Sequence, residues 1–535
     1  MPLIDMGNFG MSGVVSDAAP WDLDPTALTD GRNFRIHNGR ILPSGGSQLA
    51  TPETSSGGKI GHIGQSTSAN GDNIWIVCTD STVEKWNGSN FDVIFNYPTS
   101  VDETKFSVCV IGQAVFINNP DSYPVYWIND GSMSQAEWLA WGPQVDENGD
   151  LTGNTDTWQD AGKKCRVLSS HKNFLFALGM IEQDGGAVVY GDRVRWSHPC
   201  EPNGIPYTWE EPRPSDRSSI AGYVTLGRGG DVVGGESLRD SMVIYSEKAI
   251  SIMDFTGDAL GWRRRSISNT YGLCGKDAVV ECKGVHYFMS TEDILAFDGN
   301  QVQSILQGRM RKRYSADLNY SWLERCFCLH NMTFNEIWFC FPHNNNSSAT
   351  MAYTYNYRDQ SIGIRDLSLM GGVIHADFGR GTLNLGKDRW DDSTVSWQQV
   401  REMWDQNATN SFGGLVIGGI GSNIYSLDTT EPEDITESYI ERIGMPTNGH
   451  DNNMTVTRMY PHIEGKAAVR IRIGSQQQAG GAVDWKSYRE FFPGTSRKVD
   501  VKSTGELHCL RIEMPVDGGI NFTGLDLDAV PAGKR

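Results

Sequence analysis

Two pairs of adjacent carboxylates, Glu210–Glu211 and Asp391–Asp392, are the residues of this sequence best suited to acid–base chemistry. Glycosidases place two carboxyl groups on opposite sides of the bond that they cleave. Adjacent residues of a strand point to opposite faces, however, so neither pair forms a natural acid/base couple. The Ser-x-Asp-x-Gly-x-x-Trp motif of sialidase-type enzymes is also missing. We therefore expect no catalytic residue and no enzyme activity.

Metal-binding and phosphate-binding residue types occur without the spacing that such sites need. Cys326, Cys328 and His330 would share one face of a strand, but no second Cys/His pair follows at the spacing of a zinc ribbon. The glycine-rich stretch 227–235 lacks the Gly-Lys-Ser/Thr of a phosphate-binding loop and starts no helical pattern. It predicts a loop before a strand at Met242. We expect no metal and no cofactor.

Basic residues gather in two short clusters of an otherwise acidic chain. The chain has 46 Lys and Arg against 65 Asp and Glu, a net charge of -19. This balance speaks against a dedicated nucleic-acid binder, because such proteins neutralise phosphates with Lys and Arg. The clusters are either solvated salt-bridge sets or contacts with an acidic partner subunit or with DNA phosphates. The candidate contact residues are Arg263, Arg264, Arg265, Arg309, Arg311, Lys312 and Arg313.

Neither targeting signals nor disulfides are predicted. Residues 1–10 have no basic n-region and no apolar h-region of a secretory signal. No stretch approaches the ~20 apolar residues of a membrane span. The ten cysteines are scattered, and several lie inside apolar runs, such as Cys78 and Cys340. We expect them to be buried thiols in a protein made in the cytosol.

Short apolar runs bounded by turn residues recur along the chain and predict β-strands. They are rich in β-branched and aromatic residues and are too short for helices. Their continuous apolar character is typical of strands that are buried on both faces. No long window shows a helical period, so the predicted fold class is all-β. The clearest runs are Ile74–Cys78, Ala114–Ile117, Phe174–Ala177, Met242–Tyr245 and Glu336–Cys340.

A hairpin-like pattern repeats along the chain, and Asp80–Phe91 aligns without gaps on Thr291–Val302. Each copy has a polar turn, an aliphatic and an aromatic residue, and then Asn-Gly or Asp-Gly, the preferred residues of tight hairpin turns. Repeated hairpins predict a β-propeller. The stretch 61–427 has room for roughly eight blades of about 40–45 residues, or fewer if it contains insertions such as Asp146–Asp160. Looser copies are Ser246–Gly257, Gly421–Asp428 and Phe34–Ile41.

The last hundred residues have a different pattern. The acidic linker Asp428–Asp434 ends the repetitive region. Beyond it, Val469–Ile473 and Leu510–Met514 alternate apolar and charged residues, as strands with one buried face do. The predicted organisation is an N-terminal arm with first strands (1–60), a β-propeller with insertions (61–435) and a smaller, β-sandwich-like platform domain (436–535), to which the N-terminal segment is a candidate contributor.

The most specific phrase of the chain is N-terminal: Gly13–Trp21 ends in Ala-Pro-Trp, and Leu28–Ile36 and Asn38–Arg40 follow. This phrase resembles the opening of tail nozzle or tail hub proteins of short-tailed bacteriophages. The resemblance continues over nearly the whole chain, although each further motif is weak alone. Those further motifs are Asp192–Pro199, Thr208–Trp209, Ser246–Ile250, Phe255–Gly257, Tyr271–Gly275, Ile294–Gly299 and Met459–Gly465.

The resemblance implies a structural protein of the virion tail, made in the cytoplasm of the host bacterium. Six copies would form a ring that continues the channel for genome ejection below a head-side adaptor ring. Tail spikes, fibres or a plug would lie around or below it. Double-stranded DNA would pass through the lumen without sequence-specific binding. No membrane segment and no catalytic residue is implied.

The resemblance assigns structural roles to the residues that match. Pro20 and Trp21 would anchor the N-terminal arm, and Asn33 belongs to the same phrase. Gly31, Gly39, Gly88 and Gly299 would supply turns that a Cβ atom would strain. Six copies would carry 6 × -19 = -114, and acids facing the lumen would keep DNA from adhering. The arginine clusters are candidates for pairing with a neighbouring copy.

Two other functions stay open at this point. A propeller of this kind also serves as a scaffold for protein–protein interaction, acting as a monomer. A propeller glycosidase acting on cell-surface glycans is the enzymatic alternative, and it needs a carboxylate pair brought together by the fold.

Overall fold

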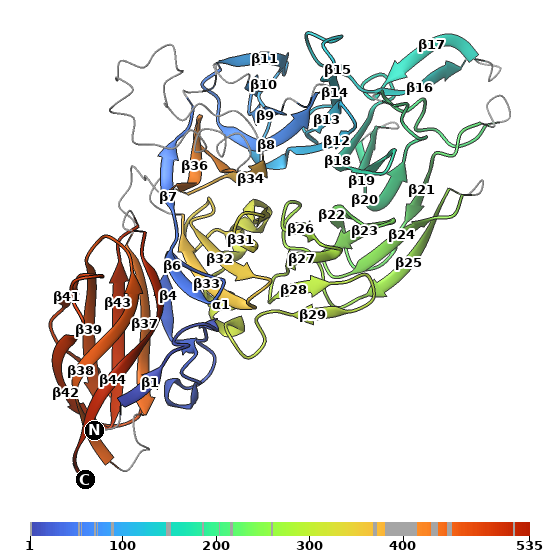
Figure 1. The fold of residues 1–535 in the computed structure, drawn as a ribbon. Helices are drawn as coiled ribbons and strands as arrows, with labels where there is room; N and C mark the ends of the chain where they lie inside the picture. The colour runs from blue at the N-terminus through green and yellow to red at the C-terminus, as the bar shows by residue number, and fades with distance from the viewer. Residues whose placement is uncertain are drawn as a thin grey trace, which may run out of the picture.

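The computed structural model is nearly all β (Figure 1). No helix in the described part of the chain is long and apolar enough to cross a membrane. The residues that the structure describes are 3–51, 54, 56–68, 71, 73–86, 90–145, 151–183, 187–202, 204–213, 218–257, 261–367, 372–379, 415–429, 437–446, 452–516 and 519–534.

Within these residues, seven small antiparallel sheets stand around a common centre and form a β-propeller (Figure 1). The first four consist of consecutive strands, from the innermost to the outermost. They are β8 (Ile60–Thr67), β9 (Asn73–Thr79), β10 (Thr82–Trp86) and β11 (Phe91–Asn96); β12 (Ser107–Ile111), β13 (Ala114–Asn118), β14 (Val125–Ile128) and β15 (Glu137–Trp138); β18 (Lys163–His171), β19 (Phe174–Gln183), β20 (Ala187–Trp196) and β21 (Gly222–Thr225); β22 (Val232–Leu238), β23 (Ser241–Ser246), β24 (Ile250–Phe255) and β25 (Trp262–Ser268).

The other three sheets complete the circle. The sixth is extended at its outer edge by two short N-terminal strands, and the seventh takes its outermost strand from the N-terminal arm. They are β26 (Val279–Cys282), β27 (Val285–Met289), β28 (Ile294–Phe297) and β29 (Val302–Ser304); β30 (Phe327–Asn331), β31 (Glu336–Phe341), β32 (Met351–Asn356) and β33 (Ser361–Asp366) with β2 (Gly13–Val14) and β3 (Ala27–Leu28); β34 (His375–Gly379), β35 (Leu415–Ile420), β36 (Asn423–Thr429) and β7 (Gly46–Leu49).

The circle closes in two ways. Each innermost strand contacts the next one, and β34 of the seventh sheet contacts β8 of the first. In addition β7 pairs with β36, with Gln48 opposite Ser426, so a strand from before the first sheet completes the last. Outside the circle, the hairpin β16 (Ala140–Val145) and β17 (Leu151–Thr157) follows the second sheet. It covers the described part of the predicted insertion.

Two six-stranded sheets form the platform, and both chain ends lie at its far end (Figure 1). The sheets contact each other through β39 and β42, which is the sandwich arrangement that alternating strands favour. One sheet holds β1 (Leu3–Met6), β5 (Phe34–His37), β6 (Arg40–Pro43), β38 (Asn452–Glu464), β42 (Val499–Gly505) and β44 (Asn521–Lys534); the other holds β4 (Asp30–Arg32), β37 (Ser438–Pro446), β39 (Val469–Gln476), β40 (Asp484–Trp485), β41 (Arg489–Phe491) and β43 (Leu507–Met514).

The propeller and the platform share one apolar core. A single cluster of buried side chains includes Phe522 of β44, Phe34 of β5 and Ile362 of β33, and each of the three is at most 1% exposed. Helical structure is limited to short connections in the described chain. These are η1 (Pro20–Asp22), η2 (Glu103–Lys105), α1 (Arg311–Asp317) and η3 (Tyr320–Arg325).

The all-β propeller with a β-rich platform is confirmed, and the strand predictions map onto fixed positions in the sheets. All five apolar runs are second strands, and β13 and β31 are buried along their whole length. The repeat copies in β10, β24, β28 and β36 are all third strands. The copy Phe34–Ile41 is different, because it forms the hairpin β5–β6 of the platform.

Two details of the sequence prediction are wrong, and the number of described propeller sheets is defined. It is seven, fewer than eight as expected for a stretch with insertions, because β19 and β20 are long and the hairpin β16–β17 uses chain outside the sheets. The loop predicted over 227–235 ends early, since β22 begins at Val232. Gly31 lies in strand β4 and forms no turn. Gly39 (φ 70°) and Gly299 (φ 98°) do occupy turns, and Gly88 lies outside the described residues.

Candidate functional site

A network of hydrogen bonds and ion pairs lies where the N-terminal arm joins propeller and platform. Asn33, with a φ of 54° and 4% exposure, stands at the centre of this junction. Its Nδ2 donates to the Glu437 carbonyl at 3.0 Å. Its Oδ1 accepts from the Asp366 N–H at 2.8 Å. Because Asp366 ends β33 and Glu437 precedes β37, this side chain links the sixth sheet to the platform.

Pro20 and Trp21 form the short helix η1, which lies against β37 of the platform. The guanidinium of Arg442 donates to the Pro20 carbonyl at 2.7 Å and to the Leu23 carbonyl at 2.9 Å. Burial lowers the pKa of Arg442 to about 10. A buried cation held by two carbonyls of the arm is costly to leave unpaired, so η1 is fixed to the platform.

Gly31 is required by close packing. A Cβ atom at Gly31 would lie 2.7 Å from the Phe34 ring and 3.1 Å from the Tyr439 carbonyl oxygen. Neither neighbour can withdraw easily, because Phe34 is fully buried and Tyr439 pairs with Arg32 in the sheet. The glycine is therefore fixed by steric contact instead of by a turn.

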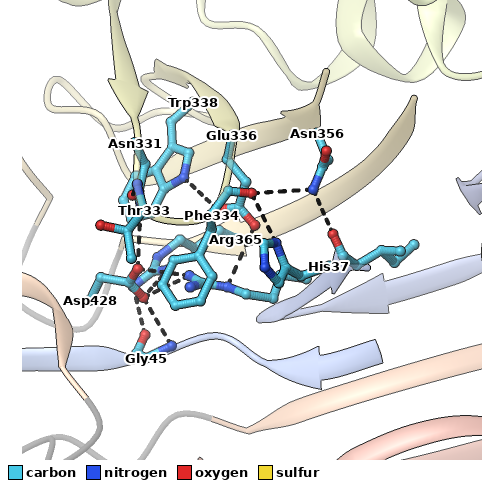
Figure 2. Close-up of polar contacts among 12 residues, drawn as sticks. His37, Gly45, Asn331, Thr333, Phe334, Glu336, Trp338, Asn356, Arg365 and Asp428 are labelled. Atoms are coloured by element: carbon cyan, nitrogen blue, oxygen red, sulfur yellow. Dashed lines mark hydrogen bonds and ion pairs between the residues drawn. The ribbon is translucent and has the colours of Figure 1, made fainter. Parts of the chain in front are cut away.

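A buried ionic cluster lies beside the same junction (Figure 2). Arg35 of β5 pairs with Asp428 of β36 at 2.7 Å and lies 3.5 Å from Glu336 of β31. Arg365 of β33 pairs with Asp428 at 3.1 Å and donates to the Gly45 carbonyl at 2.6 Å. All four side chains are at most 8% exposed. The cluster thus connects the arm, the sixth sheet and the seventh sheet.

Two further hydrogen bonds and a ring contact involve the charged groups of this cluster. Asn331 donates to Asp428 at 3.1 Å, and the Trp338 indole donates to Glu336 at 3.0 Å. The Phe334 ring lies 3.7 Å from the Arg35 guanidinium. Buried charges are tolerated when they are paired and hydrogen-bonded in this way; Arg35 Nε alone of this cluster makes no hydrogen bond and faces Glu336 at 3.5 Å.

The two carboxyl groups of the cluster have opposite pKa shifts. Burial disfavours the charged form of Asp428, but Arg35 and Arg365 outweigh it and lower its pKa to about 2. Burial raises the pKa of Glu336, and its partner Arg35 only partly offsets this. Asp428 is therefore the permanent anion between the two arginines. Chemically, the arrangement can hold segments together, and it presents no reactive group.

A cavity of about 450 Å³ opens near the centre of the propeller. Charged side chains line it, and several of them are paired: Arg166 with Asp231 at 2.6 Å, and Lys105 with Asp121 at 3.2 Å. Val232 and Ile181 supply apolar lining. Because both basic and acidic side chains line the cavity, it favours neither anionic nor cationic ligands.

Three other side chains have the residue types of metal ligands. His62 of β8, His375 of β34 and Asp277 bring ligand atoms within 4.8 Å of one another. Lys276, however, forms an ion pair with Asp277, and the Ile63 N–H donates to His375 Nδ1 at 3.2 Å. Two of the three donor groups are thus already engaged. The stacked rings of His62 and His375, 4.0 Å apart, join the first sheet to the seventh.

The metal-like and acid–base residues singled out in the sequence are not brought into such a group. His330 Nε2 contacts Cys282 Sγ at 3.4 Å and the Tyr357 hydroxyl at 3.3 Å. Glu210 accepts from the Trp141 indole at 3.2 Å and forms an ion pair with Arg213. Asp391 and Asp392 lie outside the described residues. All ten cysteines are free thiols, eight of them buried and two half-buried, as expected.

The second basic cluster is largely engaged within the chain. Arg311 lies 3.4 Å from Asp293, and Arg313 pairs with Asp30 at 2.9 Å. Arg309 donates to the Gln360 carbonyl at 2.5 Å, and the Lys312 N–H donates to Asp17 at 3.1 Å. These contacts fix α1 against the N-terminal arm. A role of this cluster between subunits stays a prediction.

The first basic cluster lies on β25, the outermost strand of the fourth sheet. Arg264 donates to the Leu226 carbonyl at 2.6 Å, and Arg265 lies 3.4 Å from Asp254. Arg263 and Arg265 are exposed. Both lie exposed at this edge, Arg265 with Asp254 of its own chain beside it, while Arg264 is directed back into its own chain.

Sequence reasoning missed Asp428, Glu336, Arg365 and Arg442. The available signal was weak: a charged residue inside or at the end of an apolar strand, as Glu336 and Arg365 are. Burial of such a residue requires a partner of opposite charge, but that partner lies in a different sheet.

Comparisons with known proteins identify no family and leave the function open. No family model matches the chain, and no curated protein matches it. A structure of YCF48 bound to D1 peptide is 11% identical, with 78% of this chain and 100% of that chain covered and a TM-score of 0.34. The computationally designed Ika8 protein is 9% identical, with 71% and 100% covered and a TM-score of 0.34. The extracellular domain of the putative hybrid two-component system BT3049 from B. thetaiotaomicron is 11% identical, with 90% and 58% covered and a TM-score of 0.40.

Proposed function

We propose that this protein is a structural subunit of a short-tailed bacteriophage tail, six copies of which form a nozzle or hub ring around the channel for genome ejection. The ring would continue the channel below the head-side adaptor and would carry spikes, fibres or a plug. Viral DNA would pass through it without being read.

The observation that carries the proposal is the place of the phrase that resembles tail nozzle proteins. Asn33 links the sixth sheet of the propeller to the platform, and Pro20 and Gly31 lie against platform residues. Their contacts are steric and hydrogen-bonding contacts with Arg442, Phe34 and Glu437. A motif with this role favours a rigid building block over a catalyst, because it fixes the relative position of two bodies.

The charge of the chain fits the same role. A subunit of net charge -19 contributes to a strongly negative ring. Negative walls repel DNA phosphates, so a lumen lined with acids would let the genome slide instead of binding it.

The mass of the purified protein in solution tests the proposal. A six-membered ring has a mass of 6 × 59.2 = 355.2 kDa, which analytical ultracentrifugation separates clearly from the 59.2 kDa monomer. We expect the larger species, alone or after addition of the adaptor ring of the same virus. A monomer at every protein concentration and salt concentration, with and without the adaptor, would refute the proposal and favour a solitary scaffold.

A further inference from the structure

Exposed apolar side chains are most frequent on the third and fourth sheets, which lie on the side of the propeller away from the platform (Figure 1). Six of the ten large exposed hydrophobic residues of the described chain lie on the third and fourth sheets, their connections and the hairpin β16–β17. Exposed large apolar residues on neighbouring elements are candidates for an interaction site. The six are Leu151, Val188, Val189, Tyr207, Tyr223 and Phe255, each 40–53% exposed.

Arginines accompany these residues. Arg263 and Arg265 are exposed on β25, and Phe255 lies opposite Trp262 on the same pair of strands. Arg193 contacts the rings of Tyr190 and Tyr223. Aromatic residues and arginine are enriched in protein–protein interfaces and at their energetic centres. We call this surface, formed by Leu151, Tyr207, Tyr223, Phe255, Arg263 and Arg265, the arginine rim.

The charge of the propeller is distributed unevenly between neighbouring sheets. Residues 60–138, which span the first and second sheets, contain nine acids and two bases, a net charge of 2 - 9 = -7. Residues 163–268, which span the third and fourth sheets, contain 14 bases and 13 acids, a net charge of 14 - 13 = +1. Most of the acidity of this half of the propeller thus lies on the first two sheets.

The acidic sheets also present acids at their outer edge. Glu137 lies on β15, the outermost strand of the second sheet, and Asp130 lies in the connection that leads to it. Both are exposed. They occupy, on the second sheet, the outer position that Arg263 and Arg265 occupy on the fourth. We call Asp130 and Glu137 the acidic edge.

We propose that the arginine rim of one copy binds the acidic edge of a second copy of this chain. The contact uses two different surfaces, so it is heterologous, and repetition of such a contact closes a ring. That the partner is a second copy of this chain rests on the proposed ring function. The new element is the pair of surfaces that meet. Opposite charges at the edge select the partner and its register, and the exposed aromatic and aliphatic side chains supply the buried area.

Charge reversal with compensation tests the pairing. We expect the double substitution Arg263→Glu/Arg265→Glu to abolish the ring in ultracentrifugation while the melting temperature of the chain changes little. Addition of Asp130→Lys/Glu137→Lys in the same chain should restore the ring, because every interface then carries both reversed faces. The control Arg489→Glu/Arg497→Glu changes the same charge at exposed positions of the platform and should leave the ring intact. An intact ring in the arginine double variant, or no restoration by the compensating pair, overturns the pairing.

A photo-crosslinker separates failure of this pairing from failure of the proposed function. With p-benzoylphenylalanine in place of Arg263, we expect mass spectrometry to find crosslinks to the peptide around Glu137 of another copy. A ring of about 355 kDa with crosslinks to other peptides overturns the proposed faces and leaves the ring function standing. Absence of any oligomer in the unmodified protein overturns both.

Discussion

Single residues fix the joint between the two bodies of this protein. Asn33 adopts a left-handed backbone conformation that few residue types tolerate. Its side chain forms hydrogen bonds with both the sixth sheet and the platform. Arg442, which is 1% exposed, holds two carbonyls of the arm. The sequence identified the phrase that contains Asn33, but it could not reveal that the amide partners lie more than 300 residues away, at Asp366 and Glu437.

Asn33 allows its backbone and side-chain roles to be separated. Asn33→Ala removes the side-chain hydrogen bonds to Glu437 and Asp366 and keeps a residue with a Cβ atom at a φ of 54°. We therefore expect the free energy of unfolding to fall by about 3 kcal/mol. Asn33→Gly removes only the hydrogen bonds and should cost about 1 kcal/mol less. Chemical denaturation of the two variants measures the difference. Equal losses would show that the backbone conformation is not strained.

The stability of the protein should depend on pH through Glu236, which lies on the innermost strand β22. Burial raises its pKa from 4.5 to about 7, and the nearby Glu281 carboxyl adds to the rise. Because the folded pKa lies above the unfolded one, ionisation costs stability as the pH rises from 4.5 to 7, and the cost persists above that range. Glu236→Gln should therefore be more stable than the wild type by about 3 kcal/mol at pH 8. Near pH 4 the two proteins should unfold alike. A constant difference at both pH values would contradict this assignment.

At the scale of elements, the sequence predicted strand identity better than strand partners. Continuous apolar runs gave the second strands, because those strands are buried on both faces whatever their neighbours are. The hairpin repeat gave the third strands, because an Asn-Gly or Asp-Gly turn is a local requirement. The repeat also aligns Asp298 with Asp428. Asp298 accepts the N–H groups of Asn300 and Gln301 in its own turn, whereas Asp428 lies between two arginines of other strands, which local sequence cannot show.

Closure of the propeller by β7 was not predictable for the same reason. The strand Gly46–Leu49 has no strong β pattern and acquires its place by pairing with β36. The Ala50 N–H that follows it donates to the Ile424 carbonyl at 2.9 Å.

Substitution of Ala50 tests the importance of this closure. Ala50→Pro removes the N–H, so we expect a loss of about 3 kcal/mol and faster hydrogen exchange in β36. Ala50→Ser keeps the N–H and serves as the control, with a loss below about 1 kcal/mol. If the proline variant exchanged its β36 amides as slowly as the wild type, closure by β7 would not stabilise the seventh sheet.

At the scale of the whole molecule, the shared core makes propeller and platform one body. The apolar cluster that runs from β44 to β33, the Asn33 bridge and the Arg35–Asp428 cluster all cross the joint or lie beside it. A body of this kind suits an assembly in which each copy must keep its shape under load. The function was the part that sequence patterns left most open, because the proposed ring would be defined by surfaces between copies, and no local motif encodes those surfaces.

Electron microscopy of the purified protein tests the proposed ring most directly. We predict end-on views of a six-fold ring with an open centre, each subunit showing a propeller disc joined to a smaller platform. Particles of single discs, or closed assemblies without a central passage, would contradict the account.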